Sequence, residues 1–408
     1  MSSFLNQTPQ NFRVLFLDMD SFFASCEQQA NPKLRGQAVG VVPQLIDSTC
    51  VLSASYEAKW LGVKTGTSVR EARAKIPQMI FVEARPRYYK SIHWQLADIL
   101  SHFSPWVEAK SIDEFSMQMA LSERNDASAM RLGQAIKHRF RQEIGEYITA
   151  SIGFGPNQFL AKVAGELNKP NGFGVITLQN LDAVLGGLSM TDLPGIARGL
   201  SRRLQAHGIH TTSTLLNADT AKLRRILGFL GEVWWYRLHG WEVDDYALKR
   251  STIGHSHVLP PVWRTYDRAW QVLQKLTHKA GQRLRREGYF ATHTSLSIQY
   301  MGHQHFFDHT RSMPYSDTAN ALTISRRLFE RQPYRLEPIL HLAFSFGGLV
   351  KSNARPQSLF INLEKPIRLS EALDKVNDKY GRDTIFNAGM LSAKLTAPDR
   401  IPFGKVRY

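Results

Sequence analysis

The sequence predicts a multidomain α+β protein, on three observations. The chain has 408 residues, more than a single hydrophobic core usually holds. Up to about residue 176, short apolar runs alternate with stretches of helical periodicity, whereas residues 177–240 are helical throughout. Beyond residue 253, a long basic helix stands among predicted strands. We therefore expect an α/β or α+β domain, then a small all-α unit and a separate α+β module.

The first part of the chain begins with a buried strand. Residues 14–17 form a short apolar run, and we expect the helix after it to cover residues 21–30, with Asp20 or Ser21 as its cap. Residues 107–114 alternate apolar and charged side chains, which places Asp113 and Glu114 on a strand or turn. We expect further strands over residues 38–43, 49–54 and 147–154, and helices over residues 87–103, 126–145 and 156–168.

The last part of the chain follows a polar, charged stretch over residues 244–251 that is typical of a linker between domains. We expect a basic helix over residues 265–287, and strands over residues 253–259, 292–301, 304–311 and 338–349. The cations of this helix are either a solvated face or part of a surface for a polyanion. They are Lys275, Lys279, Arg283, Arg285 and Arg286.

Charge and composition narrow the classes of function. Lysine and arginine number 51 against 35 acidic residues, a formal charge of +16, which favours a nucleic-acid partner but also occurs on membrane-surface proteins. No apolar run approaches the roughly 18 residues of a membrane-spanning helix, and residues 1–12 lack the pattern of a secretion signal. Two cysteines cannot build a disulfide framework or zinc cluster. We therefore expect a protein of the reducing cytoplasm with no membrane partner.

Three carboxylates are candidates for metal binding. Asp18 directly follows the first strand, and the pair Asp113 and Glu114 ends another extended segment. Two-metal phosphoryl chemistry needs such oxygen ligands on adjacent strand ends, and Mg²⁺ is the hard cation that prefers them. The alternative is that Asp18 and Asp20 cap helices and the pair forms an exposed turn, which spacing alone favours. For Asp20 we expect a cap or a supporting role beside the metals.

Five ordered motifs resemble those of Y-family DNA polymerases, the translesion type. They are residues 16–27 (FLDMDSFFASCE), 56–59 (YEAK), 111–114 (SIDE), 151–162 (SIGFGPNQFLAK) and 168–172 (NKPNG). The resemblance covers residues 12–350 and is strongest to the DinB or polymerase IV branch. Residues 373–382 (LDKVNDKYGR) are similar to the catalytic subunit of polymerase V, so the subgroup stays open.

The resemblance implies the shape of a right-hand polymerase. Its expected domains are a palm (1–24 and 86–176), small fingers (25–85), a helical thumb with a helix-hairpin-helix (177–242), a linker (243–252), a little finger (253–351) and a C-terminal tail (352–408). The implied activity is two-metal transfer of deoxynucleotides to a primer, with primer–template DNA and deoxynucleoside triphosphates as substrates. Two Mg²⁺ ions, which Mn²⁺ could replace, would bind Asp18, Asp113, Glu114 and the backbone carbonyl of Met19.

The resemblance also implies a nucleotide pocket. Phe23 matches the sugar gate whose ring would collide with a 2′-hydroxyl. Helix geometry, however, does not bury two successive residues on one face, so we expect one of Phe22 and Phe23 to be core. Where the family commonly has arginine, this sequence has lysine at residue 59, which cannot make arginine's two-pronged phosphate contact. Phe115-Ser116 also departs from the family pattern. The pocket residues implied are Phe22, Phe23, Ser53, Tyr56, Lys59 and Lys169.

Two further segments imply contacts to partners. Residues 193–200 (LPGIARGL) are similar to a helix-hairpin-helix turn, in which Gly195, Ile196, Ala197 and Arg198 would offer backbone amides to a DNA phosphate. A plain helical turn is the alternative. Residues 357–360 (QSLF) resemble a sliding-clamp-binding peptide that is one residue short, with Gln357, Leu359 and Phe360 as anchors, and such short motifs often arise by chance.

Two other functions compete with an active polymerase. A non-catalytic relative would bind DNA and recruit partners, but the retention of Asp18, Asp113 and Glu114 argues against it. A nucleotidyl cyclase could share a two-metal palm, but it would have no use for the basic helical and C-terminal modules.

Overall fold

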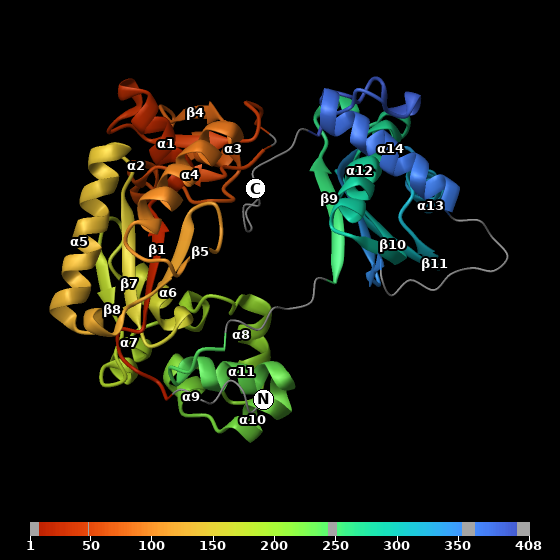
Figure 1. The fold of residues 1–408 in the computed structure, drawn as a ribbon. Helices are drawn as coiled ribbons and strands as arrows, with labels where there is room; N and C mark the ends of the chain where they lie inside the picture. The colour runs from red at the N-terminus through yellow and green to blue at the C-terminus, as the bar shows by residue number, and fades with distance from the viewer. Residues whose placement is uncertain (1–7, 48, 244–250, 353–363, 398–408) are drawn as a thin grey trace. The chain divides into compact units, whose positions relative to one another are not determined.

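The computed structural model describes residues 8–47, 49–243, 251–352 and 364–397, which form two compact units. The first unit lies within residues 8–243 and the second within residues 251–397 (Figure 1). Both units mix helices with sheets, so the expected multidomain α+β class is confirmed. Among the residues described, none of the helices combines the length and the apolarity needed to cross a lipid bilayer.

A five-stranded sheet organises the first unit, with β1 (Val14–Met19) at its centre. The strand order is β5-β6-β1-β7-β8, and β1 runs antiparallel to both β6 and β7. Because β1 is paired on both edges, its polar backbone groups are satisfied within the sheet. The other bounds are β5 (Val107–Ala109), β6 (Glu114–Gln118), β7 (Ala150–Gly155) and β8 (Phe173–Val175).

The two faces of β1 meet different helices. Leu15 and Leu17 belong to a core cluster with side chains of α4 (Pro86–Ser101) and α5 (Asp126–Glu143), and α5 lies beside β7 and β8 in Figure 1. Val14 and Phe16 pack instead with Ala161 of α6 (Gln158–Leu167). Since side chains alternate along a strand, Asp18 continues the Phe16 face. Burial on both faces explains the continuous apolar run of residues 14–17.

Helix α6 packs unusually close to the sheet because β7 carries glycine where the two meet. A Cβ atom on Gly153 would lie 1.9 Å from the carbonyl oxygen of Ala161. Any larger residue would therefore push α6 away from β7. This close approach matters for the site, since α6 carries Lys162 and leads to Lys169.

Helix α1 (Phe22–Ala30) follows β1 closely, as expected, but its start corrects two expectations. Neither Asp20 nor Ser21 caps it: Ser21 has a left-handed backbone with φ 48° and makes no side-chain cap bond. Phe22 and Phe23 are both buried, with 3% and 4% exposure. Both rings belong to the same core cluster as α4, and Phe23 stacks on Tyr89 of that helix. The start of the helix is thus enclosed on two sides. Successive residues on different faces of α1 can therefore both be buried, although only one was expected to be core.

A three-stranded sheet in the order β3-β2-β4 adjoins this core. Strands β2 (Val39–Val42) and β3 (Ser53–Ala54) confirm the two strands predicted there, although β3 is short. Strand β4 (Ile80–Glu83) runs parallel to β2 and was not predicted. Two short helices pack on this sheet, α2 (Tyr56–Trp60) and α3 (Val69–Lys75).

The end of the first unit is helical, as predicted. Its core gathers leucine and isoleucine side chains with Trp234, and it continues into the apolar face of α6. The helices are α7 (Leu181–Gly186), α8 (Arg198–Gln205), α9 (Thr212–Leu216), α10 (Thr220–Leu227) and α11 (Phe229–Leu238). Residues 244–250 of the expected linker lie outside the described residues.

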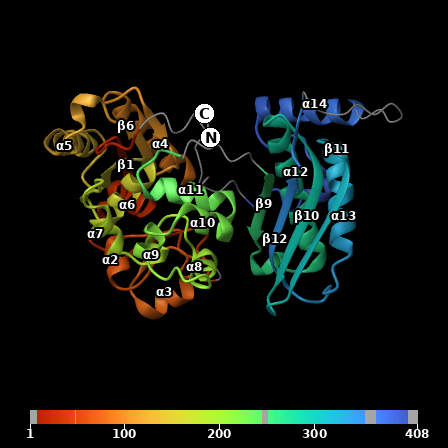
Figure 2. The ribbon, with the colours of Figure 1, turned by 90° about the horizontal axis from the view of Figure 1, so that it is seen from below.

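The second unit is an antiparallel sheet in the order β11-β10-β12-β9, with its helices on one side (Figure 2). Its strands are β9 (Thr252–Val258), β10 (Tyr289–Tyr300), β11 (His305–Tyr315), β12 (Ile339–Gly347) and the short β13 (Val350–Lys351), which pairs with β10. Helix α12 (Tyr266–Arg286) confirms the predicted basic helix. Helix α13 (Thr318–Glu330), capped by Asp317, was not predicted.

Four of the five predicted cations of α12 contact residues 364–397, so this face is not simply solvated. The fifth, Arg283, pairs with Glu287 and is partly exposed. DNA binding by this unit stays a prediction. Arg285 makes a two-pronged ion pair with Asp374 of α14 (Glu364–Tyr380), at 2.6 and 3.0 Å. Lys275 donates to the carbonyl oxygen of Lys394, and Lys279 donates to that of Ala397 at 2.9 Å. Residues 364–397 therefore form a helical layer over α12, while residues 353–363 lie outside the described residues.

Replacing Asp374 with alanine should destabilise the second unit. The side chain of Arg285 is only 5% exposed, so its charge would be left buried with the Ser316 carbonyl oxygen as acceptor but without a carboxylate, at a cost of about 3 kcal/mol. The free energy of unfolding, measured in urea on the full chain, should fall accordingly, with faster hydrogen exchange in α12 and α14.

The matched control is Asp378→Ala. Asp378, one turn beyond Asp374 on α14, pairs with Arg286, the residue next to Arg285 on α12. That pair is mostly exposed, so its loss should cost less than about 1 kcal/mol. If the two variants lose the same free energy of unfolding, the buried ion pair does not contribute more than the exposed pair to holding α12 and α14 together.

Candidate active site

The three predicted carboxylates lie together where β1 ends and β6 begins. Asp18 is directly opposite Glu114 in the antiparallel register of these strands, so their side chains project from the same face of the sheet. The backbone N–H of Met19 donates to the carbonyl oxygen of Asp113 at 2.9 Å, which holds the bend before β6 against β1. The sequence thus brings residue 18 beside residues 113 and 114 through strand pairing.

Each carboxylate has its own partner. Lys169 lies 2.9 Å from Asp18, and Lys162 of α6 lies 2.5 Å from Glu114. Asp113 accepts a hydrogen bond from Ser111 at 2.5 Å. Among the residues that the structure describes, no three Asp, Glu, His or Cys side chains are grouped as closely as bound metal ligands would be. In this structure two of the three carboxylates have lysine partners, and Asp113 has a serine hydroxyl.

Burial favours the protonated form of two carboxyl groups at this site. Burial, followed by the charges of Glu166 and Asp113, raises the pKa of Asp18 to about 7, although Lys169 opposes the shift. Burial and the charge of Glu114 also raise the pKa of Asp113. Ionised carboxylates here would be stabilised by a nearby cation. The donor set of oxygens on adjacent strand ends therefore fits a hard divalent cation.

Asp20 organises the surroundings of the site instead of capping α1. Its buried carboxylate accepts hydrogen bonds from the Thr149 hydroxyl at 3.0 Å, the Ser151 hydroxyl at 2.8 Å and the Asn171 backbone N–H at 2.8 Å. It therefore ties the end of β1 to β7 and to the loop after α6. Because Asn171 is held in this way, Lys169 is positioned beside Asp18. A supporting role for Asp20 agrees with these contacts.

The predicted triphosphate residues converge on the same place. Tyr56 and Lys59 share one face of α2, and the Lys59 ammonium lies 4.3 Å from the centre of the Tyr56 ring. The Tyr56 hydroxyl reaches Asp20 at 3.5 Å. Burial and the nearby charge of Lys169 lower the pKa of Lys59. For Lys169, burial opposes the shift, but Asp18 and Glu166 raise its pKa above the ordinary value. Together with Lys162, three ammonium groups thus stand near the carboxylates.

The aromatic part of the expected pocket is held rigidly. The Phe23 ring stacks on Tyr89 with ring centres 4.7 Å apart, and the Tyr89 hydroxyl donates to Glu27 at 2.7 Å. Glu27 also receives two hydrogen bonds from Arg85. The Ser53 hydroxyl donates to the Ser21 carbonyl oxygen at 3.1 Å, which fastens β3 to the start of α1. Sequence reasoning missed the support from Glu27, Arg85 and Tyr89, because it depends on packing between α1 and α4.

The two predicted partner segments differ in what the structure describes. Gly195 has φ 94°, Ile196 is buried, and Ala197 is the N-cap of α8 without a side-chain cap bond. The first amides of α8, from Arg198 onward, consequently have no side-chain acceptor from the cap residue. The clamp-like peptide with Gln357, Leu359 and Phe360 lies outside the described residues.

Comparison with known proteins identifies the family. A sequence model of the impB/mucB/samB family matches residues 17–166, and the model of that family's C-terminal domain matches residues 250–359. A protein of Moorella thermoacetica named DNA polymerase IV is 32% identical to the chain, over 93% of this chain and 96% of that protein. The chain belongs to the impB/mucB/samB family. A DNA polymerase IV of Pelotomaculum thermopropionicum is another member at 32% identity, over 93% of this chain and 95% of its own.

Solved structures agree with this family assignment. A Y-family DNA polymerase chimera has 24% identity and a TM-score of 0.69, over 83% of this chain and 99% of its own. The DinB protein of Sulfolobus solfataricus has 25% identity and a TM-score of 0.50, over 82% and 98%. The resemblance stated from the motifs is thus confirmed, and this impB/mucB/samB member is a DinB-like Y-family polymerase in sequence and fold.

The raised pKa of Asp18 predicts a pH dependence of stability in the metal-free protein. The pKa is about 7 in the folded chain and 3.8 for an unperturbed carboxyl. Between these values the folded state retains a proton that the unfolded state releases, so the contribution of Asp18 to the free energy of unfolding falls as pH rises from about 4 to about 7. Above about pH 7 it should level off.

The measurement is urea unfolding in EDTA from pH 4.5 to pH 8, for the parent and for Asp18→Asn. Asparagine does not titrate, so the parent should lose stability relative to the variant as pH rises. A difference that stays constant across this range would show that the carboxyl has an ordinary pKa.

Proposed function

We propose that this chain is a template-directed DNA polymerase that extends primers in translesion synthesis at damaged DNA. The observation that carries the proposal is the pairing of Asp18 with Glu114 across β1 and β6, beside Asp113, Lys59 and Lys169. Carboxylates and ammonium groups of this arrangement suit the transfer of a phosphoryl group. Relatives that carry the name DNA polymerase IV, aligned over 93% of the chain, support the same function.

We propose that Asp18, Asp113 and Glu114 hold two Mg²⁺ ions, with the backbone carbonyl of Met19 as a further ligand, and that Mn²⁺ can replace Mg²⁺. When bound, the ions would lower the pKa of the primer hydroxyl and neutralise the triphosphate. The carboxylates would keep the reacting groups aligned from the paired ends of β1 and β6. Asp20 would keep this edge in place by its hydrogen bonds to β7 and to Asn171.

Tyr56, Lys59 and Lys169 would bind the triphosphate of the incoming nucleotide. In the free chain Lys169 lies against Asp18 and Glu166, so it would exchange these partners for phosphate oxygens once cations neutralise Asp18. Tyr56 is neutral at physiological pH, and burial raises its pKa further, so its hydroxyl can act as a hydrogen-bond donor. Lys59 supplies charge without the fork of arginine, which favours weaker orientation of the phosphates.

Phe23 would exclude ribonucleotides, since its ring is held in place on Tyr89 and cannot easily move away from a 2′-hydroxyl. Phe22 and Ser53 would complete the pocket around the start of α1.

For primer–template DNA, we propose that the amides of Gly195, Ile196, Ala197 and Arg198 bind a backbone phosphate at the start of α8. The helix-free side of the second unit's sheet would bind further backbone phosphates. We also propose a monomer in a bacterial cytoplasm, in which the palm, fingers, thumb and little finger keep the bounds expected from the sequence. Clamp binding by Gln357, Leu359 and Phe360 stays a prediction, and loss of clamp pull-down on replacing Leu359 and Phe360 with alanine would support it.

Primer extension tests the polymerase directly. The parent should extend a primed template with magnesium and all four deoxynucleotides. Asp113→Asn should extend at least about a hundredfold more slowly, a loss of about 2.7 kcal/mol in transition-state stabilisation, and should still bind DNA. Asp98→Asn, a change of the same kind in α4 away from the site, should extend like the parent.

Extension by Asp113→Asn at the parent's rate would exclude this site. Failure of the parent to extend, with intact DNA binding, would favour the non-catalytic alternative instead. Release of a cyclic nucleotide would favour a cyclase.

Phe23→Ala should admit ribonucleotides. Without the ring, the ratio of kcat/KM for deoxynucleotide over ribonucleotide should fall by at least about tenfold, or about 1.4 kcal/mol. Single-nucleotide insertion with each sugar gives this ratio.

The control is Phe22→Ala, which removes an equally buried ring from the same helix start. Since Phe22 would contribute to the pocket without acting as the gate, its loss should lower kcat/KM for both sugars alike, and the ratio should stay close to that of the parent. The same loss of discrimination in both variants would mean that a loosened α1, and not a gate at Phe23, sets the ratio.

A further inference from the structure

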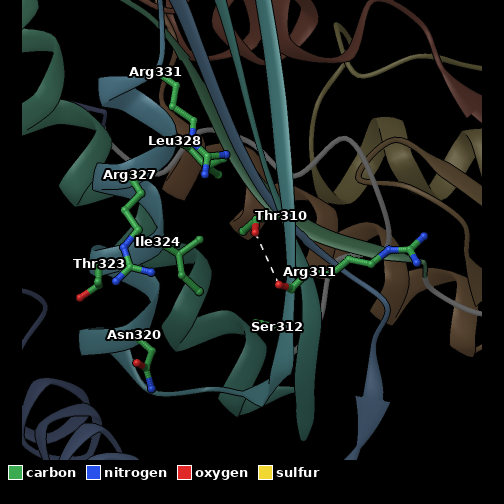
Figure 3. Close-up of a pocket in the computed structure, with 9 residues that line it drawn as sticks. All are labelled: Thr310, Arg311, Ser312, Asn320, Thr323, Ile324, Arg327, Leu328 and Arg331. Carbon is green, nitrogen blue, oxygen red and sulfur yellow. Dashed lines mark hydrogen bonds between the residues drawn. The ribbon is translucent and has the colours of Figure 1, made fainter.

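The second unit contains a hollow that the proposed polymerase function does not use. It lies between the edge strand β11 and helix α13 and has a volume of about 240 Å³ (Figure 3). Its lining residues are Thr310, Arg311, Ser312, Asn320, Thr323, Ile324, Arg327, Leu328 and Arg331.

The hollow exists because the helix-facing side of β11 is polar. Asp308 is paired with Leu296 of β10, and Thr310 with Thr294, whose side chains are buried beneath the helices. A strand face covered by a helix normally carries apolar residues that fill the space between the two. Here β11 instead presents Asp308, Thr310 and Ser312. The gap beside α13 is therefore a polar cavity and not packed core.

The charges around the hollow leave a surplus of one positive charge. Two arginines, Arg327 and Arg331, line it from successive turns of α13. Arg331 pairs with Asp308 at 3.2 Å, so two positive charges minus one negative charge leave +1. Arg326 on the same helix pairs with Glu330 at 2.5 Å. Within the described part of the chain, no ion pair engages Arg327. Arg311 points away from the arginines of α13 (Figure 3).

The hydroxyl groups of the hollow also lack acceptors. The Ser312 hydroxyl oxygen is buried and has no hydrogen-bond partner among the described residues. The Thr310 hydroxyl makes only a long contact of 3.5 Å with the Arg311 carbonyl oxygen. Leaving a buried hydroxyl unpaired costs about 1–3 kcal/mol. The guanidinium of Arg327 adds donors only. A ligand that satisfies this set must be rich in acceptors and negatively charged.

We propose that the hollow between β11 and α13 binds a phosphate-type oxyanion. Arg327 and Arg331 provide planar, two-pronged donors that match the spacing of phosphate oxygens. Ser312 and Thr310 donate to the remaining oxygens. The phosphate could be a free ion, such as inorganic phosphate or pyrophosphate, or belong to a nucleic-acid backbone. Both sources share the chemistry that the hollow recognises, and the experiment separates them.

The first measurement is the thermal unfolding temperature of the full-length protein without magnesium or DNA, in sodium phosphate or pyrophosphate against sodium chloride of equal ionic strength. Phosphate should stabilise the parent, because it binds the folded state. Arg327→Gln should weaken this binding at least about tenfold, and Ser312→Ala should weaken it without changing charge. Arg327→Lys, which keeps the charge and loses the fork, should fall between Arg327→Gln and the parent.

The matched control is Arg326→Gln. It removes one positive charge from the same turn of α13, but its side chain does not line the hollow, so phosphate binding should be unchanged. The second measurement is the salt dependence of binding to a fluorescent duplex and a single strand. The slope is that of the logarithm of the binding constant against the logarithm of salt concentration. If a backbone phosphate binds in the hollow, the magnitude of this slope should be smaller by about one for Arg327→Gln than for Arg326→Gln.

The site is supported if Arg327→Gln, and not Arg326→Gln, changes either free-phosphate binding or the salt slope. The measurement that changes shows whether the ligand is a free phosphate or a nucleic-acid backbone. If neither free phosphate binding nor the salt slope distinguishes Arg327→Gln from Arg326→Gln, the hollow is only a solvated gap and the proposal is wrong. Neither measurement depends on catalysis, so the polymerase proposal stands or falls separately.

Discussion

The register of β1 between β6 and β7 determines where the residues of the candidate active site lie. Asp18 faces Glu114, and the amide of Met19 holds the carbonyl of Asp113. A shift of one residue would turn Asp18 to the opposite face of the sheet, toward α4 and α5, and would bring Leu17 into its place. The apolar cores on both faces oppose such a shift, because Val14 and Phe16 fit against α6 while Leu15 and Leu17 fit against the other helices.

The same arrangement explains the electrostatics of the site. Bringing carboxylates to one sheet edge and burying them raises their proton affinity, and the raised pKa of Asp18 records that cost. Two lysines from α6 and the loop after it lie against Asp18 and Glu114. The close packing of α6 on Gly153 sets the place of Lys162, and Asp20 sets that of Lys169 through Asn171. Cation binding and nucleotide binding are thereby linked, because a lysine released from a carboxylate becomes available to phosphate.

Sequence alone could predict the elements whose signal is local. The change from the apolar residues 14–17 to Asp18 marked the end of β1, and helical periodicity located α4, α5, α6 and α12 within a few residues. The motifs identified the family. Helix α13 was missed although Asp317 caps it, because its threonine and isoleucine obscure the helical pattern. Strand β4 is short and derives its identity from parallel pairing with β2.

What sequence could not predict are contacts between distant parts of the chain. Three partners of the Asp20 carboxylate are 129 to 151 residues away and Tyr56 is 36 residues away, and Asp374 is 89 residues from Arg285. No local pattern marks such pairs, so the sequence did not reveal that Lys275, Lys279 and Arg285 of α12 contact the C-terminal segment. The sequence likewise shows polar residues at alternate positions of β11. The hollow beside them could not be predicted, because it depends on how α13 packs against this strand.

The most direct test of the account is to count bound Mn²⁺ by electron paramagnetic resonance, using the full chain with a chain-terminated primer on a template and the matching deoxynucleotide. Signal from free Mn²⁺ should disappear until two ions are bound per chain. Asp18→Asn and Glu114→Gln should each reduce the number or the affinity, because both replace a ligand from the paired ends of β1 and β6. Equal Mn²⁺ binding by the parent and both variants would contradict the metal site at this sheet edge.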